Sequence, residues 1–173
     1  MLDKISLMLR LLSPDYDSTD EYQEQYKELT GLTGELITMG YLDLWGAKYF
    51  HIEQKYGNKP LWLKKGKRPD FVAFTTDPDE TILIDAKFHA PKEGKFRIEI
   101  KDLLEYEELV SNLSSNGRKV GFLFIMPIGG CSINNFYCYT LDDFTSGTTS
   151  DDGKFKLVDV TEPLNAYDLQ GSE

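Results

Sequence analysis

Apolar residues recur at spacings of three and four in the first quarter of the chain, a pattern typical of a helix. The residues that follow this spacing are Leu29, Leu32, Leu36 and Met39. The polar segment 18–21 has the composition of a helix start. We therefore predict a long helix over residues 19–43, with a break at Gly31 or Gly34 left open, after a short apolar helix or arm over residues 1–12.

Shorter apolar runs downstream predict strands. These runs cover residues 48–56, 60–63, 71–75, 81–88, 120–126, 136–140 and 155–160. Asp77 to Glu80 has the residues of a turn and closes two of the runs into a hairpin. Residues 145–153 are predicted to form a polar loop, and residues 165–173 are expected to fray.

A second helix is predicted after the hairpin. Its apolar positions are Ile98, Ile100, Leu103, Leu104, Leu109, Val110 and Leu113. Asn116-Gly117 is a good C-terminal stop for it. A helical crossover between the strands at 81–88 and 120–126 predicts that these two strands are parallel.

This order of elements predicts an α/β domain with a central mixed β-sheet flanked by helices. The 173 residues are enough for one packed core. We expect a single domain with an acidic N-terminal arm (1–18), a core at about 19–126, C-terminal strands (134–160) and the frayed tail.

Composition excludes several classes of protein. No apolar run reaches the roughly 18 residues of a membrane span, and Lys4 and Arg10 interrupt the apolar N-terminus, so neither a transmembrane helix nor a signal peptide is predicted. Cys131 and Cys138 are too few for a disulfide framework or an all-cysteine zinc site. We expect a cytoplasmic protein in which both are small apolar residues.

Two acids and a lysine are predicted to meet at one end of the hairpin. The expected register places Asp70 opposite Ala86 and therefore beside Asp85. Because side chains alternate along a strand, Asp85 and Lys87 point to the same face. The apolar run Ile82–Ile84 precedes them, so these charges emerge from an apolar wall and need local stabilisation.

Paired carboxylates in this setting suit Mg²⁺, with Mn²⁺ as a substitute. Mg²⁺ takes oxygen ligands, keeps several waters and bridges to substrate phosphates. It polarises a phosphoryl oxygen and lowers the pKa of the attacking water. Lys87 is placed either to stabilise charge on the scissile phosphate or to help activate that water. The cluster thus predicts metal-dependent hydrolysis of phosphodiester bonds.

The residues Pro69-Asp70 and, after fourteen others, Asp85-Ala86-Lys87 resemble the motif of the PD-(D/E)xK nuclease superfamily. This superfamily includes restriction endonucleases, Holliday-junction resolvases and RecB-type exonucleases. The resemblance implies a restriction endonuclease-like core of helix, three-stranded meander, helix and strand. It also implies that Asp70 and Asp85 bind the metal with the Ala86 carbonyl, and that Lys87 is catalytic.

The same resemblance points to further site residues. Members often add a glutamate from the first helix; Glu35 stands at that place, and Glu28 is the alternative seven residues upstream on the same helical face. RecB-type members carry a Gln and, four residues later, a Tyr on the next helix. Tyr106 matches the Tyr, whereas Asp102 stands at the Gln position. These two residues and His89 are accessory candidates.

The net charge of −10 argues against nucleic-acid binding until it is divided along the chain. The net charge is −7 over residues 13–47 and −6 over residues 141–173. Over residues 48–101, which contain the predicted site, it is +4. The acidic ends either limit non-specific DNA binding or contact a protein partner. The bases that flank the site are predicted to hold a phosphate backbone; they are Lys64, Lys65, Lys67, Arg68, Lys92, Lys95, Arg97 and Lys101.

The leading hypothesis is an Mg²⁺-dependent nuclease, with DNA preferred to RNA on the resemblance alone. A second is a nuclease-fold subunit that binds nucleic acid or a protein partner without catalysis. A third is an unrelated α/β protein that binds a protein partner. Many members of the superfamily are dimers, so the resemblance also allows a homodimer.

Overall fold

The computed structural model describes residues 20–52, 67–115, 117–128 and 134–169, with side chains from residue 29 onward. The predicted N-terminal arm, the predicted strand at 60–63 and the bases Lys64 and Lys65 lie outside the described residues. The first described element is α2 (Asp20–Leu44), a helix of 25 residues that continues through Gly31 and Gly34.

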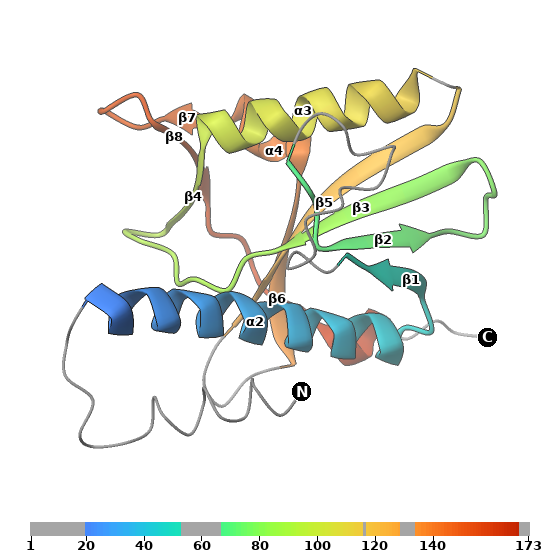
Figure 1. The fold of residues 1–173 in the computed structure, drawn as a ribbon, viewed down its shortest axis with the longest axis horizontal. Coiled ribbons are helices and arrows are strands. Elements are labelled where there is room, and N and C mark those ends of the chain that lie inside the picture. Colours follow the sequence, from blue (N-terminus) through green and yellow to red (C-terminus); the bar gives the residue numbers. More distant parts are fainter. Residues whose placement is uncertain (1–19, 53–66, 116, 129–133, 170–173) are drawn as a thin grey trace.

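A mixed sheet of six strands forms the centre of the structure, in the order β1-β2-β3-β5-β6-β9 (Figure 1). Its strands are β1 (Lys48–His51), β2 (Phe71–Phe74), β3 (Glu80–Ala86), β5 (Lys119–Pro127), β6 (Asn135–Thr140) and β9 (Leu164–Asn165). The β3 and β5 strands are parallel, as the helical crossover predicts, and the other neighbouring pairs are antiparallel. The predicted α/β class with a central mixed sheet is therefore confirmed.

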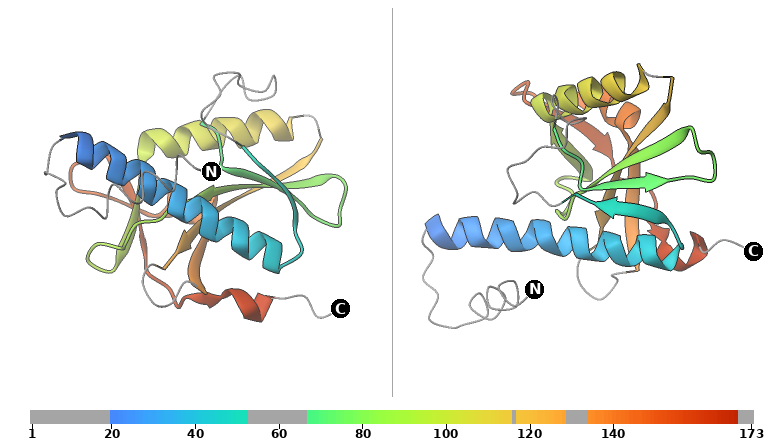
Figure 2. Two further views of the ribbon diagram at one scale, coloured as in Figure 1. Left: turned by 60° about the horizontal axis from the view of Figure 1, so that its bottom comes forward. Right: turned by 45° about the vertical axis from the view of Figure 1, so that its right-hand side comes forward.

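Helices cover both faces of this sheet. The α2 helix packs on one face, and α3 (Ile100–Ser114) and α4 (Leu141–Ser146) pack on the other (Figures 1 and 2). Leu83 and Ile84 are neighbours on β3 but are buried in opposite clusters, which explains the continuous apolar run of this strand. None of the described helices is long and apolar enough to cross a membrane. The free thiol Cys138 packs against the α2-side cluster; Cys131 lies outside the described residues.

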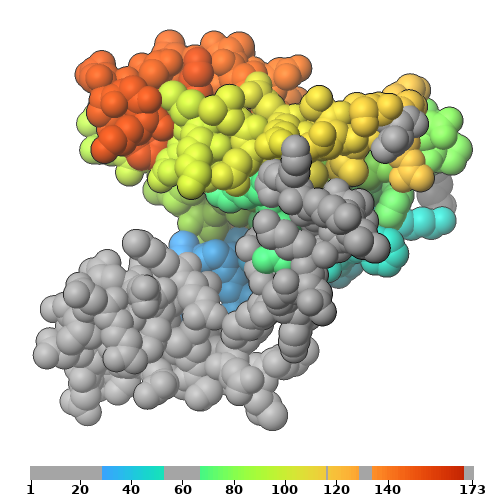
Figure 3. Space-filling view, turned by 45° about the horizontal axis from the view of Figure 1, so that its top comes forward, coloured from blue at the N-terminus to red at the C-terminus, as the bar shows by residue number. Residues whose placement is uncertain are grey.

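A second sheet, which the sequence did not predict, lies beside α3. It consists of β4 (Lys95–Glu99), β8 (Phe155–Asp159) and β7 (Thr148–Thr149), all antiparallel. The expectation that Ile98 begins a helix is wrong, because Phe96 and Ile98 alternate with exposed residues and are buried from a strand. Figure 3 shows α3 and the segment that contains α4, β7 and β8 side by side on one face.

Two expectations for the C-terminal third are also corrected. The loop expected at 145–153 begins inside α4, whose N-terminus is a capping box between Thr140 and Asp143. Residues 165–169, which were expected to fray, form the end of β9 and a 3₁₀ helix, η2 (Ala166–Leu169). The Trp45 ring N–H donates a hydrogen bond of 2.8 Å to the Ala166 carbonyl and ties this segment to α2.

Candidate metal centre

The hairpin of β2 and β3 brings Asp70 and Asp85 together. Phe71 pairs with Ile84, one residue away from the predicted register, and the Asp70 N–H donates a 2.9 Å hydrogen bond to the Ile84 carbonyl, so Asp70 lies beside the end of β3 that carries Asp85. Both acids are buried, with 5% and 2% of their surface exposed. The Ala86 N–H donates a 2.7 Å hydrogen bond to Asp70 Oδ2, which fixes this carboxylate against the end of β3.

Each oxygen of Asp85 faces a different side chain. The Tyr106 hydroxyl, from the fully buried side of α3, donates a hydrogen bond to Asp85 Oδ1. The Lys87 ammonium forms an ion pair with Asp85 Oδ2. This second oxygen is buried and accepts no hydrogen bond of normal geometry from the described residues. The predicted acid–acid–lysine cluster and the accessory Tyr106 are thus in direct contact.

Burial and the closeness of their charges shift the pKa values of Asp70 and Lys87. Burial, together with the charges of Asp85 and Glu35, raises the pKa of Asp70 to about 7, against the opposing effects of the hydrogen bond from Ala86 and the charge of Lys87. Burial alone lowers the pKa of Lys87, but the charges of Asp85 and Asp70 outweigh it and the net pKa is raised. The lysine is therefore cationic at neutral pH, and the two acids still repel each other.

Glu35 approaches the acids from α2. Its charge contributes to the raised pKa of Asp70, but its carboxylate Oε2 lies 2.9 Å from His51 Nε2, on β1. The position of α2 depends on Gly34, because an added Cβ there would lie 2.7 Å from Cβ of Phe88 in the chain after β3. The alternative, Glu28, lies among the residues whose side chains are not described.

The other two accessory candidates lie near Lys87. Asp102, in the first turn of α3, forms an ion pair with Lys67, whose ammonium lies 5.6 Å from the centre of the Tyr106 ring. Lys67 therefore has an intramolecular partner. Burial lowers the pKa of His89, and the charges of Lys87 and Arg97 lower it further, so this imidazole is neutral at pH 7.

Lys87 and three of the bases predicted to hold phosphates line a cavity of about 340 Å³. These three bases are Lys92, Lys95 and Arg97, and two acids, Glu99 and Asp102, line the same cavity. The Arg97 guanidinium lies 5.1 Å from the centre of the Phe155 ring, on β8. Lys101 is exposed on α3 and Arg68 is half-buried before β2, and neither lines this cavity.

The donor set fits a cation that keeps most of its water. Among the described residues, no three His, Cys, Asp or Glu side chains are grouped closely enough to hold a metal ion. Two adjacent buried carboxylates that repel each other nevertheless suit Mg²⁺, which is commonly bound through one or two carboxylates. The Ala86 carbonyl as a further ligand stays a prediction.

Sequence reasoning missed His51 and Phe155. His51 lies inside the strand predicted at 48–56 and ends the observed β1, but its partnership with Glu35 depends on how α2 packs against β1. Phe155 was placed on the last strand, with no indication that this strand pairs with β4. Comparisons of the chain with models of known protein families and with curated proteins found no match.

Proposed function

We propose that this protein is a metal-dependent nuclease of the PD-(D/E)xK type that hydrolyses phosphodiester bonds, in DNA rather than RNA. One observation carries the proposal: Asp70 and Asp85 are buried together at one end of a hairpin, where the half-buried Lys87 forms an ion pair with Asp85. The order of α2, the strands β1 to β3, α3 and β5 supports it, since the superfamily resemblance implies helix, meander, helix and strand; β4 is an additional strand.

Asp70 and Asp85 would hold the metal, with Glu35 acting directly or through water. When bound, Mg²⁺ polarises the phosphoryl oxygen and lowers the pKa of the attacking water. Tyr106 and the Ala86 N–H hold the two carboxylates in fixed orientations. Restraint of this kind keeps ligands within the narrow geometry that metal sites require.

Lys87 acts as a fixed positive charge. Its raised pKa keeps it protonated at neutral pH, so it stabilises charge on the scissile phosphate rather than accepting a proton from water. The basic cavity at Lys87 supplies Lys92 and Arg97 for neighbouring phosphates, together with Lys95, whose ammonium also lies 3.1 Å from the exposed carboxylate of Asp159. Although the net charge of the chain is negative, the surface next to the site is therefore positively charged and can attract a phosphate backbone.

The test measures cleavage of supercoiled plasmid and of a labelled single-stranded oligonucleotide with Mg²⁺ or Mn²⁺. Asp85→Asn and Lys87→Ala should each lower the cleavage rate by about 100-fold or more, the usual cost of removing one transition-state contact. The matched controls are Asp77→Asn and Lys119→Ala, which break an exposed 2.9 Å carboxylate–lysine pair at the opposite end of β3. They should cleave at the wild-type rate.

Circular dichroism should show that all four variants are folded. The absence of metal-dependent cleavage on every substrate would contradict the proposal. Retained DNA binding without cleavage would instead favour a non-catalytic nuclease-fold subunit.

A further inference from the structure

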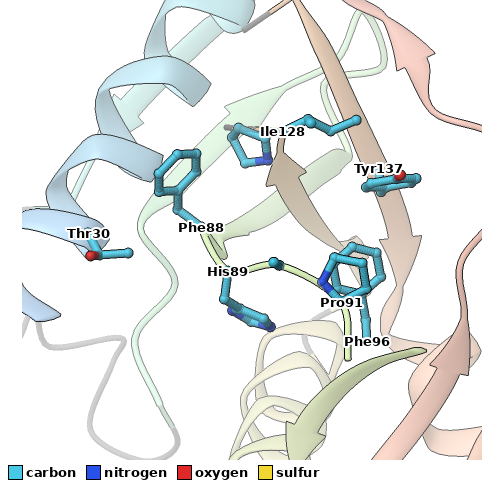
Figure 4. A pocket seen from close by; sticks show the side chains of 9 residues that line it. Thr30, Phe88, His89, Pro91, Phe96, Ile128 and Tyr137 are labelled. Atoms are coloured by element: carbon cyan, nitrogen blue, oxygen red, sulfur yellow. The ribbon is translucent and has the colours of Figure 1, made fainter. Parts of the chain in front are cut away.

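A second, apolar cavity of about 540 Å³ lies at the end of β5, next to the basic one. Figure 4 shows its walls: the Phe88 ring lies toward α2, and the Phe96 and Tyr137 rings lie on the other side. The centres of the Phe96 and Tyr137 rings are 5.0 Å apart. Ala90, Pro91, Pro127 and Ile128 add aliphatic side chains to the lining. Both cavities have the size of small-molecule sites, about 300–1000 Å³.

The two cavities share one wall. His89 and Ala90 line both, so the chain after Lys87 separates an aromatic space from a cationic one. A tight turn shapes the basic side, because Glu93 and Gly94 both have positive φ, and the backbones of Lys92 and Lys95 exchange two hydrogen bonds. The turn holds these two lysines across from each other beside the candidate metal centre.

We propose that the paired cavities bind one unpaired nucleotide of the substrate, with its base in the aromatic cavity and its phosphate in the basic cavity. This inference rests on the proposed function and specifies its substrate as DNA that is single-stranded at the cleavage site. An aromatic space beside a cationic one matches the two parts of a nucleotide, because any base stacks on aromatic rings and phosphates are held by Lys and Arg.

A paired base fits this arrangement poorly. It must first leave the stack and lose its partner before it enters a pocket, and this cost is smallest for a base that is already single-stranded. The apolar cavity offers aromatic rings and aliphatic side chains, which suit stacking without selecting one base. We therefore expect a preference for single strands and tails, with little dependence on sequence.

The experiment removes the base and the pocket separately. Labelled 20-nucleotide single strands, each lacking one base at a different position, are cleaved with Mg²⁺, and the products are mapped. Loss of one base, at a fixed distance from the cut, should slow wild-type cleavage by about tenfold, a typical effect of losing one base stack. The Tyr137→Ala variant should cleave the intact strand as slowly as the wild type cleaves the strand that lacks this base. The variant should cleave the abasic strand no more slowly than the intact one.

The control for Tyr137→Ala is Tyr167→Ala, which removes an exposed tyrosine from η2 outside both cavities. Because Tyr137 also packs against the core, a second variant, Ala90→Trp, fills the space from the exposed loop. The Ala90→Trp variant should remain folded and should, like Tyr137→Ala, cleave single strands more slowly than the wild type does. For the phosphate, Arg97→Ala should weaken binding of the single strand, and Lys48→Ala, exposed on β1, should not.

Binding of the same strands, measured by fluorescence anisotropy with Ca²⁺ in place of Mg²⁺, separates the two proposals. Equal cleavage of duplex and single strand, or an abasic scan without a sensitive position, overturns the nucleotide pocket and leaves the nuclease. Absence of cleavage together with Tyr137-dependent binding of single strands supports the pocket and overturns the nuclease. Absence of both cleavage and binding overturns both.

Discussion

A carboxylate that is 5% exposed beside a second buried carboxylate is costly to ionise, and Asp70 is in this position. The cost affects folding, because the unfolded chain ionises Asp70 near pH 3.8 whereas the folded chain does so near pH 7. Between these values the unfolded state releases a proton that the folded state keeps. The contribution of Asp70 to stability therefore falls as pH rises from about 4 to 7.

Replacing Asp70 by Asn should remove this penalty. We expect Asp70→Asn to raise the free energy of unfolding at pH 8 by on the order of 1–3 kcal/mol, with the gain fading below pH 4, where both states of the wild type are protonated. Urea denaturation at several pH values measures the effect. Asp77→Asn is a control with the opposite expected sign. The hydrogen bond from Lys119 lowers the pKa of Asp77, so the loss of this carboxylate should reduce the stability of the protein at pH 8.

A bound metal ion should offset the cost of ionising Asp70 in the wild-type protein, because it stabilises the charged carboxylate. Mg²⁺ or Mn²⁺ should raise the melting temperature more at pH 8 than at pH 5, and should have no such effect on Asp70→Asn. A wild-type protein whose stability is flat from pH 4 to 8 would contradict this account of Asp70.

The acids and their lysine could be predicted from sequence because they lie close together along one hairpin. Asp70, Asp85 and Lys87 needed only strand alternation and a turn, and an error of one residue in register left them together. Tyr106 came from the family resemblance and does contact Asp85. His51 could not be predicted, since nothing in its neighbourhood along the chain indicates that α2 brings Glu35 to it.

At the scale of elements, the contact between α2 and the chain after β3 sets the place of Glu35. Gly34 is buried there, with Phe88 directly against it. Gly31, three residues earlier in the same helix, has nothing within 4 Å of an added Cβ. The same holds for Gly40, so Gly34 alone among the three glycines of this helix meets a neighbour.

Alanine at these two glycines should have opposite effects. Gly31→Ala should stabilise the protein by up to about 1 kcal/mol, because alanine favours the helix. Gly34→Ala should destabilise it by about 1–3 kcal/mol, because Phe88 or the helix must move, and it should also slow cleavage. Urea denaturation and the single-strand assay measure both effects, and an equal gain from both substitutions would be the contrary result.

The strands of the central hairpin and crossover were predictable, whereas β4 and its pairing with β8 were not. No proline or glycine marks the change from β4 to α3 at Glu99, and the Glu99 side chain makes no capping hydrogen bond. The apolar positions of β4 therefore read as part of the following helix. β4 also pairs with β8, about sixty residues away. The α4 helix did carry a readable signal, the Thr140–Asp143 capping box.

At the scale of the whole molecule, the C-terminal segment completes the sheet and the α2-side core. β9 pairs with β6, and Ala166 is 1% exposed. Trp45, Tyr41 and Phe136 form an aromatic cluster next to it, with ring centres 5.0–5.9 Å apart. This segment therefore belongs to the folded core.

Removing residues 164–173 should destabilise the protein by about 1–3 kcal/mol or more, because the Trp45 N–H loses its acceptor and apolar rings become exposed. Removing only residues 170–173 leaves these contacts in place and is the matched control. Thermal denaturation measures both, and equal melting temperatures for the two truncated chains would show that β9 and η2 contribute nothing.

The division into two sheets has a consequence for how the protein can evolve. Asp85 lies on β3 of the six-stranded sheet and Asp70 directly before β2, whereas Lys95, Arg97 and Phe155 lie on β4 and β8 of the other sheet. On the function proposed above, mutations in the second sheet would change the choice of substrate without moving the acids. Laboratory selection for a new substrate should accumulate changes in β4 and β8, while β2 and β3 keep their sequence.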